Sequence, residues 1–215
     1  MDAVLANLDV FALGFRTTVS LTFAAAALAL VLGVLIAAMR VSPVPVLRAA
    51  GLAYVEVVRN TPLTIVFFFA VFVLPQVDVR LSFFLFAVIA LTVYHAAFFA
   101  EAVRSGVNAV PVGQAEAARS VGLTFGKSLR IVILPQALRT VVPPLINVFI
   151  ALTKNSSIAA AFGVTELTAV FQRLANANPQ AVIAILVGAA LGYLVITIPS
   201  GVVAGRVERK VAFAR

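Results

Sequence analysis

The chain has 215 residues, of which 63% are hydrophobic and 11% charged, and it carries a formal net charge of +8. A soluble domain has about 25% charged residues, so this composition places the chain in a lipid bilayer and excludes a disordered protein. The lack of cysteine excludes disulfide frameworks, thiol nucleophiles and cysteine-based zinc sites, and the scattering of basic residues between apolar runs argues against a nucleic-acid partner.

Apolar stretches that approach the length of a membrane span, about 20 residues, occur five times. We predict spans at about residues 16–40, 61–77, 81–103, 135–154 and 180–205. The fourth is long enough only if it begins near Pro135 and tolerates Arg139, whose side chain can reach the interface. We therefore expect an all-α integral membrane protein with one transmembrane domain over residues 1–215.

Basic residues are distributed unevenly between the connections of this five-span arrangement. One set of connections, which includes the loop 105–134 and the C-terminal end, holds twelve of the 16 Lys and Arg. The other set holds Arg16, Arg80, Lys154 and Arg173. Because short cytoplasmic loops retain Lys and Arg, we expect the N-terminus outside and the C-terminus in the cytoplasm.

Two connections are expected to contain short helices. Residues 44–58, which begin beside Pro43 and Pro45, are typical of an amphipathic helix on the cytoplasmic side. Before the fifth span, apolar residues recur at helical spacing and predict a short outer helix lying on the bundle: Leu167, Val170, Phe171 and Leu174.

The loop 105–134 carries the most specific pattern in the chain. Glu116, Ala117 and Ala118 are followed after three residues by Gly122, and after nine more by the run Val132-Ile133-Leu134-Pro135. Small alanines give a helix a face that fits a groove, and Gly122 can supply a left-handed C-terminal cap. The segment is either a docking helix or an interfacial helix that only closes the loop.

This pattern resembles the EAA loop of ATP-binding-cassette importer permeases, with Val132 at a position where that family has Ile. Further segments resemble the permeases for polar amino acids, so that the similarity covers about residues 16–205: 54–63, 101–106, 135–139 and 152–158. Residues 39–43 and 58–64 look most like permease subunits of actinobacterial glutamate importers. Phe98 departs from the family, which often has Tyr there.

The resemblance implies a type I ABC importer permease of the bacterial plasma membrane, which forms the path for uptake of glutamate or another polar amino acid. It also implies an ATPase dimer, a second permease subunit that is identical or homologous, and an extracytoplasmic substrate-binding protein. The residues that it assigns to ATPase coupling are Gly113, Glu116, Ala117, Ala118, Arg119 and Gly122. The chain is then not an enzyme and holds no cofactor or metal of its own, because ATP and Mg bind to the ATPase. Residues 122–128 are one residue too short between their glycines for a phosphate-binding loop.

Polar residues within spans usually face a cavity, and this selects a candidate substrate path: Thr61, Tyr94, His95, Lys154, Asn155 and Ser156. Tyr94 and His95 could equally be satisfied by packing inside the bundle. Lys154 follows Pro143 and Pro144, which we expect to disrupt the fourth span, and it could hold an amino-acid carboxylate or anchor the outer end of the helix.

A gradient-driven secondary transporter or channel is the alternative function. Such a protein would be expected to place carboxylates inside its spans as proton or sodium relays. Glu101 alone comes near that position, and its spacing from Arg104 predicts a structural ion pair. A membrane enzyme would need a nucleophile or metal cluster that the sequence does not provide.

Overall fold

The computed structural model describes residues 2–212, and every regular element among them is a helix. Six α-helices form the bundle and its largest attachments: α2 (Leu8–Arg40), α3 (Pro45–Arg59), α5 (Phe83–Asn108), α8 (Leu134–Asn155), α9 (Leu167–Ala177) and α10 (Val182–Ala212). Shorter elements connect them: α1 (Asp2–Leu5), α4 (Leu63–Phe68), the π-helix η1 (Phe69–Val73), η2 (Leu74–Val77), α6 (Val112–Ser120), α7 (Phe125–Lys127), the π-helix η3 (Ser128–Ile133), η4 (Ser156–Phe162) and η5 (Pro179–Ala181). The predicted all-α fold is confirmed.

Four helical stretches in the described part of the chain are long and apolar enough to cross a membrane: Leu8–Arg40, Phe83–Asn108, Arg130–Phe162 and Pro179–Lys210. A fifth span results if Pro45–Arg59 and Leu63–Val77, which meet at 102°, are counted together. The second predicted stretch, 61–77, is therefore only one arm of a bent pair.

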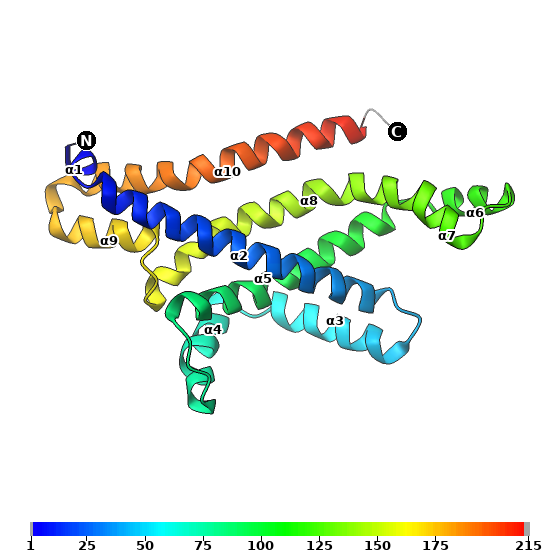
Figure 1. The fold of residues 1–215 in the computed structure, drawn as a ribbon, viewed down its shortest axis with the longest axis horizontal. Coiled ribbons are helices and arrows are strands. Elements are labelled where there is room, and N and C mark those ends of the chain that lie inside the picture. Colours follow the sequence, from blue (N-terminus) through cyan, green and yellow to red (C-terminus); the bar gives the residue numbers. More distant parts are fainter. Residues whose placement is uncertain (1, 213–215) are drawn as a thin grey trace.

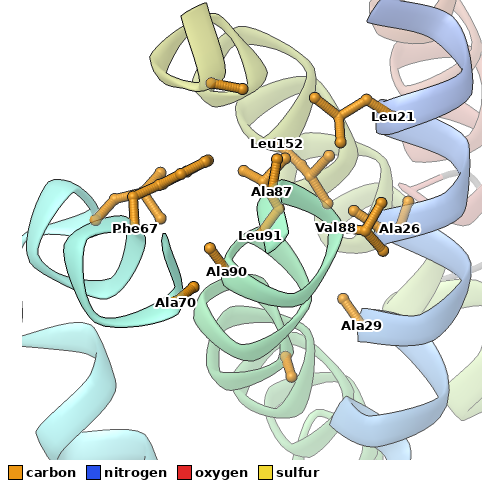
Figure 2. Close-up of a cluster of buried hydrophobic side chains, with 14 of the residues drawn as sticks. Leu21, Ala26, Ala29, Phe67, Ala70, Ala87, Val88, Ala90, Leu91 and Leu152 are labelled. Atoms are coloured by element: carbon orange, nitrogen blue, oxygen red, sulfur yellow. The ribbon is translucent and has the colours of Figure 1, made fainter. Parts of the chain in front are cut away.

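The bundle is built around a close contact between α2 and α5. Small side chains on both helices face each other there, and Phe67 of α4 and Leu152 of α8 close the cluster (Figure 2). A Cβ on Gly33 would lie 2.6 Å from the Cβ of Phe99, so α2 meets α5 almost backbone to backbone. Helices in lipid associate by this kind of packing, because lipid tails supply no hydrophobic drive between them.

Helix α3 covers Pro45–Arg59, in agreement with the helix predicted over residues 44–58. It packs back along α2 at Gly51, and its Val55 is fully buried. The Tyr54 hydroxyl donates a hydrogen bond of 2.7 Å to the carbonyl of Val93 in α5. The large apolar residues Val46, Leu52 and Val57 of α3 stay exposed, so this helix packs on α2 and α5 through one narrow face.

Helix α8 passes through Pro143 and Pro144 without a break, so the predicted disruption there is wrong. A proline removes one hydrogen bond but is tolerated in membrane helices, where neighbouring groups satisfy the freed carbonyls. The chain tightens into η4 only after Asn155, and it turns at Gly163, whose φ is +84°.

Helix α9 lies across the ends of α2 and α10, as the predicted short helix on the bundle requires. It buries Leu167, Val170 and Leu174 against these two helices. Glu166, fully buried, caps α9 by accepting hydrogen bonds from the backbone N–H groups of Thr168 and Ala169 at 2.8 and 3.0 Å. The hydroxyls of Thr18 and Tyr193 also donate to this carboxylate, so Glu166 ties α2, α9 and α10 together.

The two ends of the molecule are different in kind (Figure 1). The N-terminus, α1 and α9 lie at one end, whereas α6, α7 and the C-terminal part of α10 lie at the other. Basic residues gather at the second end, on the last turn of α2, on α6 and α7, and on the C-terminal part of α10: Arg40, Arg119, Lys127, Arg206 and Arg209. Arg215, which the sequence count includes, lies outside the described residues.

Candidate functional site

The loop between α5 and α8 projects from one end of the bundle and presents α6 at its tip (Figure 1). The predicted left-handed cap at Gly122 is confirmed, with φ of +85°. The Leu123 N–H donates to the Ala118 carbonyl and the Gly122 N–H to the Arg119 carbonyl, at 3.1 and 3.0 Å. This pair of bonds is a Schellman motif, which stops α6 sharply after Ser120.

The side chains of α6 divide into one inward residue and an exposed majority. Ala118 is buried on the side where α6 packs against η3. Glu116, Ala117 and Arg119 are exposed, and a Cβ on Gly113 would meet no atom within 4 Å. Five of the six predicted coupling residues therefore stand on a free surface, while Ala118 holds the helix to its own loop.

A cavity of about 200 Å³, whose lining is partly polar, lies between α5 and α8. Its lining residues come from one face of each helix: Tyr94, His95 and Phe98 on α5, and Val148, Ala151 and Asn155 on α8. Three of the six residues predicted for the substrate path, Tyr94, His95 and Asn155, thus meet at one site.

Hydrogen bonds fix the His95 ring at the wall of this cavity. The ring is 1% exposed, and its Nδ1 lies 3.0 Å from the carbonyl oxygen of Leu91. The Asn155 amide nitrogen lies 3.2 Å from His95 Nε2. These contacts fit a neutral imidazole that donates through Nδ1 and accepts through Nε2. The Asn155 carbonyl oxygen is left to accept a bond from a ligand.

The other three predicted path residues do not line the cavity. Thr61 lies at the bend between α3 and α4, and its hydroxyl donates to the Val57 carbonyl at 2.8 Å. Ser156 is fully buried and donates to the Thr153 carbonyl at 2.8 Å. Lys154 is exposed on α8, next to Asn155 in the chain.

Glu101 forms the predicted ion pair with Arg104, and two further arginines join it. Its carboxylate accepts hydrogen bonds from Arg40 of α2 and from Arg104. Arg59, at the end of α3, lies 3.8 Å from Glu101 Oε2. Sequence reasoning missed Arg40 and Arg59, because both are distant from Glu101 along the chain and no local spacing links them.

Phe98, Val148 and Ala151 were also missed as lining residues. The sequence held a signal for the two residues on α8, since Val148, Ala151 and Asn155 follow the i, i+3, i+7 spacing of one helix face.

A larger cavity of about 380 Å³ between α2, α5 and α8 is lined by apolar side chains alone, so it offers no group that could orient a polar ligand. Within residues 2–212, no three His, Cys, Asp or Glu side chains gather as a metal site would require.

Comparisons with known proteins agree with this fold. The family described as binding-protein-dependent transport system inner membrane component matches residues 29–213. A glutamate transport system permease protein of Corynebacterium efficiens is 39% identical, over 92% of each chain. A probable glutamine ABC transporter permease protein of Bacillus subtilis is 40% identical, over 95% of this chain and 94% of its own. A chain from a crystal structure of an amino acid ABC transporter with histidines superposes with a TM-score of 0.88 at 31% identity, covering 96% of both chains.

Proposed function

The chain belongs to the binding-protein-dependent transport system inner membrane components, and from this membership we propose that it forms the translocation path of an ATP-driven importer for a polar amino acid. ATP hydrolysis in such systems belongs to a separate ATPase subunit. Relatives are named for glutamate and glutamine transport, and we propose glutamate or a similar polar amino acid as the substrate. The observation that carries the proposal is the free α6 helix, with the Glu116, Ala117 and Gly122 spacing, at the tip of the loop.

We propose that α6 docks on the ATPase and transmits its movement to the bundle. The exposed surface of Gly113, Glu116 and Ala117 is small enough to sit in a groove of a partner. The buried Ala118 and the cap at Gly122 join the helix to η3 and α8, so a force on α6 reaches a membrane-spanning helix directly.

We propose the cavity between α5 and α8 as the substrate site. Tyr94, His95 and Asn155 supply neutral polar groups there, at a depth where polar side chains are costly unless they serve a cavity. Two carboxylates near the spans could serve a proton or sodium relay, but Glu101 is bound by arginines and the buried Glu166 is engaged as the cap of α9. This engagement argues against the gradient-driven alternative.

The proposed assembly has a dimer of ATPase subunits on the α6 side, a second permease subunit that is identical or homologous, and a substrate-binding protein on the α9 side. The proposed setting is the bacterial plasma membrane, with the N-terminus outside and the C-terminus in the cytoplasm. The basic residues at the α6 end support this orientation.

Single cysteines test the orientation in a chain that has none. A cysteine at Asp9 is expected to react with an impermeant thiol reagent added outside intact cells. A cysteine at Lys127 is expected to react only after the membrane is opened, because the α6 end is placed in the cytoplasm. Labelling of both positions from the same side would overturn the orientation.

Reconstitution tests the function. Vesicles that contain this chain with its ATPase, and that are given the binding protein, are expected to accumulate labelled glutamate only when ATP reaches the ATPase. Uptake that follows a proton or sodium gradient without ATP would contradict the proposal.

Lys154→Met extends the same assay to the proposed role of Lys154 as a second contact for substrate. Because Lys154 lies beside the cavity rather than in its wall, its loss is expected to weaken uptake at subsaturating glutamate severalfold, with the ATPase still bound. Unchanged uptake would leave Lys154 as an anchor of the helix end.

A further inference from the structure

Arg59 lies beside the Glu101 ion cluster, outside the six residues that line the α5–α8 cavity but next to one of them. Its guanidinium carbon lies 5.6 Å from the centre of the Phe98 ring, and Phe98 lines the cavity. On its other side, Nη1 lies 3.8 Å from Glu101 Oε2, beyond hydrogen-bond distance. The residue is thus held loosely between a carboxylate and an aromatic face that borders the proposed substrate site.

The charges around Glu101 do not balance. One carboxylate faces three guanidiniums, and its two oxygens already accept hydrogen bonds from Arg40 and Arg104. Within the described part of the chain, the Arg59 side chain donates no hydrogen bond. It is 41% exposed, against 10% for Arg40. Arg59 therefore has positive charge and donors to offer to another anion.

The location of Arg59 limits what that anion can be. Arg59 ends the first arm of the bent helix pair and lies beside Phe98, within the span formed by α5. It lies at the end of the bundle where Arg40 closes α2, and its side chain is partly open to solvent, so an anion can approach it. The polar groups that line the cavity, from Tyr94, His95 and Asn155, carry no formal positive charge. A bound carboxylate would need a cation, and the flat guanidinium fork matches a carboxylate with two parallel hydrogen bonds.

We propose that Arg59 is the carboxylate-binding residue of the α5–α8 cavity. Arg59 stays over the Phe98 ring and exchanges its loose contact with Glu101 for a carboxylate of the amino-acid substrate. Asn155 and Tyr94 face the remaining groups of the substrate. This inference rests on the proposed function and names the chemistry by which that site recognises its substrate.

Equilibrium binding to the purified permease–ATPase complex, without the binding protein, tests this role. The probes are labelled glutamate, glutamine, which keeps only the α-carboxylate, and isoglutamine, which keeps only the side-chain carboxylate. Arg59→Gln is expected to weaken glutamate binding by roughly ten- to a hundredfold, the loss that follows removal of a charge-assisted hydrogen bond. Whichever of glutamine and isoglutamine weakens in parallel identifies the carboxylate that Arg59 holds.

Arg104→Gln is the matched control. It removes the same charge from the same Glu101 cluster, at a residue that does not contact Phe98, and it is expected to leave binding of the three probes little changed. Arg59→Lys keeps the charge without the fork and should recover part of the affinity. If Arg59→Gln fails to assemble with the ATPase, phenylglyoxal modification of the unaltered complex replaces it: glutamate should protect Arg59 and not Arg104.

Several results would overturn the inference. These are unchanged binding of all three probes to Arg59→Gln, an equal loss in Arg104→Gln, or no protection of Arg59 by glutamate. A parent complex that binds none of the probes yet imports glutamate in vesicles would also overturn it and leave the proposed function standing. Failure of the vesicles to import any amino acid would instead refute the proposed function.

Discussion

Gly113→Trp is expected to abolish most of the coupling between ATP hydrolysis and uptake while the bundle stays folded. Gly113 lies on the exposed surface of α6, and a side chain there meets no atom of this chain within 4 Å. An indole at this place would instead stand between α6 and the ATPase. Overfilling a packed contact costs about 1–3 kcal/mol, which corresponds to a loss of ATPase affinity of roughly five- to 150-fold. Co-purification of the ATPase and substrate-stimulated hydrolysis in vesicles measure the effect.

Gly205→Trp is the control for this substitution. Gly205 lies on α10 at the same end of the molecule and likewise has open space around it, and an aromatic ring suits the membrane interface. Normal coupling in Gly205→Trp and lost coupling in Gly113→Trp would locate the ATPase contact on α6. Normal coupling in both variants would reduce the loop to a connector.

Glu166→Ala is expected to destabilise the chain by about 3 kcal/mol. The substitution removes an N-cap, worth about 1 kcal/mol, and leaves buried donors without their acceptor at about 1–3 kcal/mol. The affected groups come from three elements, because Thr18, Tyr193 and the first turn of α9 all donate to this carboxylate. Thermal unfolding of the purified protein, monitored by gel filtration of heated samples, should show a transition at a lower temperature than in the parent.

Glu166→Gln separates hydrogen bonding from charge. Its amide oxygen can still cap α9, so most of the stability should return. Equal losses in the Ala and Gln variants would show that the cap is unimportant.

Burial raises the pKa of the Glu166 carboxyl above its ordinary value. At a pH between the ordinary pKa of the unfolded chain and the raised pKa of the folded chain, the folded chain binds a proton that the unfolded chain has lost. The free energy of unfolding is therefore expected to fall as the pH rises through this range. The Gln variant, which does not titrate, should lack this dependence.

The sequence by itself determined the membrane-spanning architecture and the short elements defined by local chemistry. Long apolar runs have to form helices in lipid, because no water is present to satisfy the backbone. The cap at Gly122 and the Glu101–Arg104 pair depend on neighbours within a turn or two of the chain. For the same reason a short helix could be predicted within residues 112–122, together with the glycine that ends it.

Only the tertiary structure decided which helix faces meet. On a soluble helix the apolar face indicates the core, but in a bilayer both the lipid-facing and the packed faces are apolar, so the pattern does not identify the partner. The apolar pattern therefore does not indicate that α3 packs against both α2 and α5. The pattern also does not indicate that α8 continues through Pro143 and Pro144, because the tolerance of a membrane helix for proline depends on the groups around it. The cavity joins Tyr94 to Asn155, and the ion cluster joins Arg40 and Arg59 to Glu101, through contacts between residues that lie tens of positions apart and that only helix packing brings within reach.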